Sequence, residues 1–253
     1  MTLNLVDVPV PSGTAEAHLS LPPTGSGPGV LLYMDVIGVR PQIAAMCDRI
    51  ASWGYVVLAP NVFHRDGTVA ELAPTGDLTD PEERQAYVAT AMGRLRAHTP
   101  DQVALDAPAY LDHLASLDAV TGPALGATGY CMGAGMAVRA ATGSPGRVLA
   151  VGGFHGARLA TDDTESPHLG LTALVGSGAA FCFGHADDDP SMPPDSVAML
   201  GSALAASGLE ASNEVYAGAP HGFSMADTSA YHEGAAERMY AELRALLDER
   251  LLG

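Results

Sequence analysis

The alternation of short apolar runs with helical segments constrains the fold of this chain more than any other feature. Runs such as Tyr55–Ala59 are apolar throughout, as is typical of parallel strands buried on both faces. Segments such as Pro41–Ser52 place apolar residues at helical spacing and end near a glycine. This alternation predicts βαβ units, and therefore an α/β fold with a mostly parallel, twisted sheet flanked by helices. The expected strands are Leu3–Val10, Ala15–Leu21, Gly29–Met34, Tyr55–Ala59, Ala124–Tyr130, Val148–Gly153, Ala179–Gly184 and Glu214–Tyr216.

The helical patterns show no linker that would divide the 253 residues. We therefore expect residues 1–253 to form a single domain. Residues 61–81 lack periodicity and are rich in Asp, Gly, Pro and Thr, so they are expected to form a surface loop or a partial lid. The expected helices are Pro41–Ser52, two between this loop and Leu117, Met132–Thr142, Ser196–Ala206 and Glu233–Leu252.

The charge of the chain argues against some classes of binding partner. Formal net charge is −17, and every basic residue is arginine, which reflects either a codon bias against lysine or salt adaptation. A charge this negative argues against nucleic acid and against anionic membrane surfaces. The chain has three cysteines and shows no signal peptide and no long apolar stretch, which favours a cytoplasmic protein with reduced thiols. We expect either a monomer or a homodimer.

A glycine-flanked cysteine lies where an expected strand meets an expected helix, in Gly129-Tyr130-Cys131-Met132-Gly133. This spacing matches the sharp turn that presents a catalytic nucleophile, in which side chains at the flanking glycines would clash. The helix N-terminus favours a thiolate, and the Met132 N–H is free to face a developing oxyanion. The pattern therefore predicts Cys131 as a nucleophile.

A cysteine nucleophile needs a base and an acid that orients it. His221 follows the last expected strand beside a glycine, so it is positioned to return over the sheet to Cys131. The loop after Ala179–Gly184 carries three consecutive aspartates. Counting from the strand favours Asp187, and counting back from the following Met-Pro-Pro favours Asp189, which we prefer while keeping Asp187 as the alternative.

These motifs together resemble the dienelactone hydrolase family from about Val10 to Leu247. The likeness rests on the cysteine elbow, the acidic loop ending in Met192-Pro193-Pro194 and the run Tyr216-Ala217-Gly218-Ala219-Pro220-His221-Gly222-Phe223. It implies an α/β-hydrolase fold with an eight-stranded core. It also implies that Cys131, His221 and one of the aspartates form a catalytic triad.

The resemblance extends to the turn after the third strand, where it implies that the Ile37 N–H is an oxyanion donor together with that of Met132. Family members that cleave dienelactone carry a glutamate here that holds the resting thiol, and the matching residue is Asp35. The substrate pocket is expected to include Asp35, Tyr130, His155 and Phe223. No metal or other cofactor is expected.

The chain differs from dienelactone-cleaving members of the family at the residue that binds the substrate carboxylate. Dienelactone-cleaving members place an arginine shortly after the triad histidine to bind the substrate carboxylate, and here the corresponding stretch ends in Met225. An unpartnered buried carboxylate is costly, so dienelactone is not expected to be the natural substrate. Arg40, Arg65 and Arg84 are candidates for a replacement charge, although solvated surface positions are expected for all three.

The sequence thus predicts a hydrolase that cleaves a small ester or lactone through an acyl-enzyme. One alternative is a non-catalytic protein that binds a small ligand on a hydrolase fold. Another is a redox-sensing thiol at Cys131, for which neither Cys47 nor Cys182 is an obvious resolving partner because they fall in a helix and a strand.

Overall fold

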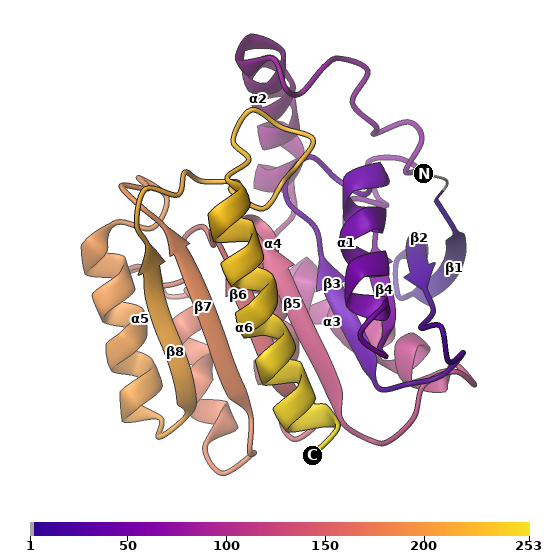
Figure 1. Ribbon diagram of the computed structural model, residues 1–253, viewed down its shortest axis with the longest axis vertical. Coiled ribbons are helices and arrows are strands. Elements are labelled where there is room, and N and C mark those ends of the chain that lie inside the picture. The colour runs from indigo at the N-terminus through magenta and orange to yellow at the C-terminus, as the bar shows by residue number, and fades with distance from the viewer. Residues whose placement is uncertain (1–2) are drawn as a thin grey trace.

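A computed structural model describes residues 3–253 and contains one eight-stranded sheet in the order β1-β2-β4-β3-β5-β6-β7-β8 (Figure 1). The first two strands form a hairpin that joins the sheet antiparallel to β4, and all later pairings are parallel. The mostly parallel α/β sheet expected from the sequence is confirmed. The strands are β1 (Leu5–Val10), β2 (Gly13–Ser20), β3 (Gly29–Tyr33), β4 (Val56–Pro60), β5 (Leu125–Tyr130), β6 (Val148–Phe154), β7 (Ala180–Ala186) and β8 (Glu210–Tyr216).

Helices cover both faces of the sheet. On one face α1 packs on β2 and β4, and α6 packs on β5, β6 and β7; on the other, α3 packs on β1 and β3, and α4 on β5 and β6. Figure 1 shows α1 and α6 in front of the sheet and α2 above its upper edge. The helices are α1 (Pro41–Ala51), α2 (Pro81–Ala97), α3 (Pro100–Ser116), α4 (Met132–Thr142), α5 (Pro194–Ala206) and α6 (Glu233–Leu251), with a 3₁₀ helix η1 (Pro167–Leu174).

The burial of the central strands explains why apolar runs in the sequence predicted them. Every residue of β3, β4, β5 and β7 is buried, because helices cover both faces. The edge strand β8 is mostly exposed and polar, and its apolar signal was limited to the end at Tyr216. It nevertheless extends from Glu210, because its backbone pairs with β7 over seven residues. Helix η1 was not expected from the sequence.

The parallel strands bring distant parts of the chain to one edge of the sheet. Asp35 follows β3, Cys131 follows β5, and His155 follows β6. Asp189 and His221 lie in the loops after β7 and β8. The carboxyl ends of parallel strands are where α/β proteins place their ligand sites. Within residues 3–253, no helix is long and apolar enough to cross a membrane.

Candidate active site

Cys131 stands at the tip of the turn between β5 and α4, with φ of 56° and ψ of −119°. This left-handed conformation is strained for a residue with a side chain. The Cys131 N–H donates to Phe154 O at 3.1 Å, and its carbonyl accepts from Ala157 N at 3.1 Å. A Cβ at Gly133 would lie 2.5 Å from Met34 O, and one at Gly129 would lie 2.7 Å from Ala134 N. The elbow therefore requires glycine at both flanks.

His221, which lines the same cavity as Cys131, forms a close polar pair with Asp189. The distance from His221 Nδ1 to Asp189 Oδ2 is 2.6 Å, and the Asp189 side chain is only 2% exposed. The other oxygen, Asp189 Oδ1, accepts from Ser191 N at 2.9 Å and Ser191 Oγ at 2.7 Å. Burial would raise the pKa of Asp189, but the hydrogen bonds from His221 and Ser191 hold it below its usual value. The carboxylate is therefore ionised and fixed in orientation.

Asp187 lies elsewhere. Its side chain is exposed, and Oδ2 accepts from the Gly218 N–H at 2.8 Å. The Asp187 N–H donates to Ala219 O at 2.8 Å, so this residue joins the loop after β7 to the loop after β8. The sequence did not distinguish the two aspartates as the acid. In the structure Asp189 contacts His221, whereas the Asp187 side chain accepts a hydrogen bond from the backbone. Sequence reasoning missed Ser191, although its spacing from Asp189 is that of an Asx turn.

The imidazole of His221 is electrostatically biased toward its charged form. Burial opposes the charge, but hydrogen bonds with Asp189 and Cys131 outweigh it and raise the pKa of His221 to about 10. A charged imidazole can donate a proton to the group that leaves when a neighbouring sulfur attacks a carbonyl. The pair is thus suited to a reaction in which sulfur is the nucleophile.

The raised pKa of His221 has a consequence for stability. From the ordinary value of 6.5 up to about 10, folded His221 holds a proton that unfolded His221 has released. Its stabilising contribution is complete below pH 6.5 and is lost as pH rises toward 10. We expect urea denaturation across this range to show a downward slope that is reduced in His221→Gln, and an equal slope in both proteins would contradict the assignment.

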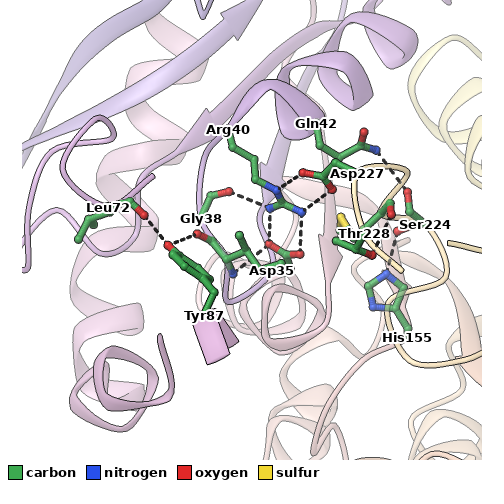
Figure 2. A network of polar contacts seen from close by, with 12 residues as sticks. Asp35, Gly38, Arg40, Gln42, Leu72, Tyr87, His155, Ser224, Asp227 and Thr228 are labelled. Atoms are coloured by element: carbon green, nitrogen blue, oxygen red, sulfur yellow. Dashed lines mark hydrogen bonds and ion pairs between the residues drawn. The ribbon is translucent and has the colours of Figure 1, made fainter. Parts of the chain in front are cut away.

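The loop between β3 and α1 (residues 34–40) forms a second wall of the site, and Figure 2 shows its polar contacts. The Ile37 N–H donates to Asp35 Oδ1 at 3.1 Å. Both oxygens of Asp35 also accept from Arg40, at 2.7 and 3.1 Å. Arg40 is 2% exposed and pairs with Asp227 as well. A solvated surface role for Arg40 is therefore wrong, because two carboxylates surround its guanidinium.

A cavity of about 460 Å³ opens beside Cys131 and His221, and its lining is predominantly apolar. A mainly apolar cavity with a few convergent polar groups is typical of a small-molecule site. Asp35, Ile37 and His155 line it as expected. The remaining lining residues are Val36, Arg84, Val88, Met92, Leu95, Ala157, Arg158, Thr161, Pro190, Ser191, Pro193, Ser196, Gly222, Met225 and Thr228.

Helix α2 contributes one continuous stripe to this cavity through Arg84, Val88, Met92 and Leu95. These four half-buried positions recur at helical spacing on one face of α2, in which only Ala91 is fully buried. The lining contains no residue from 61–80, all of which the structure describes. The segment that lines the cavity on this side is thus α2, and residues 61–81 take no part in the lining.

Of three aromatic residues expected in the pocket, only His155 lines the cavity. His155 is buried at φ of 37°, and its Nε2 lies 2.8 Å from Ser224 Oγ. Burial lowers the pKa of His155 well below its usual value, so the ring is neutral. Tyr130 and Phe223 are fully buried behind the cavity and do not line it, which differs from the expectation. Tyr130 stacks on Phe154 at 6.0 Å, and Phe223 packs edge-on to His155 at 4.9 Å.

The predicted oxyanion donor Met132 is the first residue of α4, so its N–H has no acceptor within the helix. Its side chain lines a neighbouring cavity of about 460 Å³ and not the cavity beside His221.

The other two candidate arginines have different surroundings. Arg65 makes two hydrogen bonds to the buried Asp106, at 2.6 and 3.0 Å, and lies outside the cavity lining. Arg65 is exposed, as expected for a surface position, but its guanidinium is paired with a buried carboxylate. Arg84 lines the cavity, and its buried Nε has no hydrogen-bond partner among residues 3–253. Arg84 thus brings a positive charge to the site.

Comparison with known proteins gives the family. A sequence model described as the Dienelactone hydrolase family matches residues 15–251. The chain belongs to this family of hydrolases, as its motifs suggested. Among curated relatives, a "Putative carboxymethylenebutenolidase" of Salmonella typhi is 27% identical over 94% of this chain and 83% of its own length. A carboxymethylenebutenolidase of Pseudomonas sp. strain P51 is 31% identical over 51% of this chain and 50% of its own.

Solved structures agree on the fold. The chain superposes on a "Putative Dienelactone Hydrolase" from Klebsiella pneumoniae with a TM-score of 0.81 and 23% identity, covering 98% of each chain. A dienelactone hydrolase from Anabaena variabilis gives a TM-score of 0.61 and 19% identity, covering 99% of this chain and 98% of its own. The protein therefore has the α/β-hydrolase fold expected from its elbow and strand pattern.

Proposed function

We propose that this protein hydrolyses a small ester or lactone through Cys131, with His221 as the base and Asp189 as the orienting acid. The observation that carries the proposal is the 2.6 Å contact between His221 and the buried Asp189, together with the position of Cys131 and His221 in the lining of one cavity. Cys131 and His221 line one cavity, Asp189 lies behind His221 as its hydrogen-bond partner, and all three follow the carboxyl ends of parallel strands. This geometry supports nucleophilic acyl transfer by a thiolate–imidazolium pair.

In the first half of the reaction, Cys131 Sγ attacks the carbonyl carbon and forms a carbon–sulfur bond. The carbonyl oxygen becomes an oxyanion that the Met132 and Ile37 N–H groups stabilise. As the tetrahedral intermediate collapses, the ester carbon–oxygen bond breaks. His221 gives its proton to the departing oxygen, leaving a thioester on Cys131.

In the second half, water attacks the thioester carbonyl while neutral His221 takes its proton. The carbon–sulfur bond then breaks, the acid leaves, and the thiolate and imidazolium are restored. Asp189 holds the imidazole ring in place through Nδ1 throughout, and thereby keeps Nε2 directed toward the reacting atoms.

The cavity indicates the class of substrate. Its lining is mainly apolar, and Met225 occupies the wall where dienelactone-cleaving members are expected to carry an arginine. We expect an uncharged aryl ester to be turned over at least about tenfold faster than dienelactone, which carries a carboxylate. Steady-state kinetics on both substrates with wild type and Arg84→Met checks this. Equal kcat/KM on the two substrates in wild type, lost for dienelactone alone in Arg84→Met, would contradict it.

Intact-mass spectrometry after brief exposure to a panel of aryl esters and lactones tests the proposed nucleophile. We expect an acyl adduct on the wild-type protein that disappears with time as product forms. Cys131→Ala should form no adduct, and Cys182→Ala, which alters a buried thiol, should form it normally. An adduct that persists in Cys131→Ala would overturn the assignment.

The same experiment addresses the alternatives. A protein that binds panel members without adduct or product would be a ligand-binding protein. A redox-sensing role needs a resolving thiol, but burial raises the pKa of both Cys47 and Cys182. Neither is therefore suited to attack an oxidised Cys131, and the redox alternative is not favoured.

A further inference from the structure

Arg40 is the most completely bonded side chain around the cavity. Its five N–H groups are all used: Nε and one Nη2 hydrogen donate to Asp227, the other Nη2 hydrogen and one from Nη1 donate to Asp35, and the second from Nη1 donates to Gly38 O. The guanidinium is therefore held on two edges by two carboxylates (Figure 2). Such a side chain has no donor left for a substrate.

The two carboxylates come from different parts of the chain. Asp35 belongs to the loop after β3 and lines the cavity. Asp227 belongs to the loop between β8 and α6 (residues 217–232), which also carries His221. Gln42 Nε2 donates to Ser224 O at 3.4 Å and adds a second link between the same regions. Arg40 thus connects the loop of the proposed oxyanion donor to the loop of the proposed base.

Asp35 Oδ1 accepts two hydrogen bonds of unequal strength. Arg40 Nη1 is charged and lies 2.7 Å away, whereas the neutral Ile37 N lies 3.1 Å away. Both bonds end on a carboxylate oxygen and are charge-assisted, but only the bond from Arg40 joins two opposite charges, and it is one of two that the guanidinium makes to this carboxylate. The Ile37 N–H is therefore the donor that Asp35 gives up more easily. Before substrate arrives, the predicted oxyanion donor is already held by a carboxylate oxygen.

We propose that Arg40 is a positioning residue that retains the Asp35 carboxylate while the Ile37 N–H passes from Asp35 to the carbonyl oxygen of the substrate. This inference rests on the proposed hydrolysis. Without Arg40, Asp35 would be a buried, unpaired carboxylate at the cavity wall. It would hold the Ile37 N–H more tightly, and its charge would oppose the developing oxyanion.

The test separates acylation from thiol reactivity. Acylation of Cys131 by an activated aryl ester forms an oxyanion and therefore needs the oxyanion donors, and stopped-flow measurement of the burst gives its rate. Alkylation of Cys131 by iodoacetamide forms no oxyanion and does not need these donors. We expect Arg40→Met to slow acylation by about 10² to 10³, which is the usual effect of losing one oxyanion donor. Alkylation should stay near the wild-type rate. Arg40→Lys keeps the charge but not the bidentate contacts, so its acylation rate should be intermediate.

Two controls isolate the role of Asp35. Arg65→Met breaks an ion pair with a buried carboxylate away from the cavity, so it should lower thermal stability without changing the burst. A double-mutant cycle with Asp35→Asn should show that Arg40→Met costs far less once Asp35 carries no charge. If Arg40→Met does not fold, the comparison of Arg40→Lys with Arg40→Lys/Asp35→Asn gives the same answer.

The outcomes are distinguishable. A normal burst in Arg40→Met and Arg40→Lys would overturn the inference, as would an equal loss of burst and alkylation. A full loss that persists in the Asp35→Asn background would also overturn it, because Arg40 would then not act through Asp35. A wild-type protein that shows no burst on any ester would instead refute the proposed hydrolysis, and the inference with it.

Discussion

Asp189→Asn is expected to lower kcat/KM for an activated ester about 10²-fold or more, which is the usual scale for losing a properly held base. The reason is geometric. His221 Nδ1 donates to Asp189 Oδ2 at 2.6 Å, and an amide group in that place does not fix the same ring orientation or stabilise the imidazolium. Steady-state kinetics together with the rate of Cys131 alkylation would measure the effect on the base and on the thiolate.

The matched control is Asp187→Asn, two residues away in the same loop. Within residues 3–253, its carboxylate accepts one hydrogen bond, from the Gly218 N–H at 2.8 Å. An amide oxygen can still accept that bond. We expect nearly wild-type kinetics. The reverse pattern, with Asp187→Asn inactive and Asp189→Asn active, would assign the acid to Asp187.

Gly133→Ala is expected to destabilise the protein by about 4 kcal/mol or more, or to prevent folding. An added Cβ would meet the backbone carbonyl oxygens of Tyr33, the last residue of β3, and of Met34 just after it, and buried backbone atoms there cannot move aside cheaply. Chemical denaturation would measure the loss. A protein of normal stability would show that the elbow is less tightly packed than the structure indicates.

Gly93→Ala provides the control for this substitution. Gly93 lies on the exposed face of α2, and a Cβ there would meet nothing within 4 Å. Alanine favours a helix interior over glycine by about 1 kcal/mol, so this variant should be slightly more stable than wild type. The pair distinguishes a steric requirement of the elbow from a general effect of replacing glycine.

Local chemistry accounts for what the sequence predicted well. Fully apolar runs marked the central strands because both of their faces are covered, and the glycines around Cys131 marked a turn that no other residue fits. The polar strand β8 was mostly missed because an edge strand has little apolar signal. Its extent depends on hydrogen bonds to β7, which no local pattern records.

The sequence could not rank the aspartates or place the arginines, because contacts between distant segments decide both. Asp187 and Asp189 differ by two residues, yet one bonds to the turn after β8 and the other to His221. Arg40 was expected on the surface, but its partner Asp227 is 187 residues away. Similarly, the sequence does not show that one face of α2 lines the cavity, because this depends on where the helix packs.

The sequence by itself determined that this chain builds a mostly parallel sheet with a sharp, glycine-flanked turn at Cys131, because strand burial and the steric limits of the turn are local requirements. Tertiary structure alone decided which carboxylate contacts His221, which helix covers the cavity, and that Asp35 and Arg40 hold each other beside Ile37. These depend on how the carboxyl ends of the strands are brought together, and hydrogen bonds and charge pairs at that edge act only over a few ångströms.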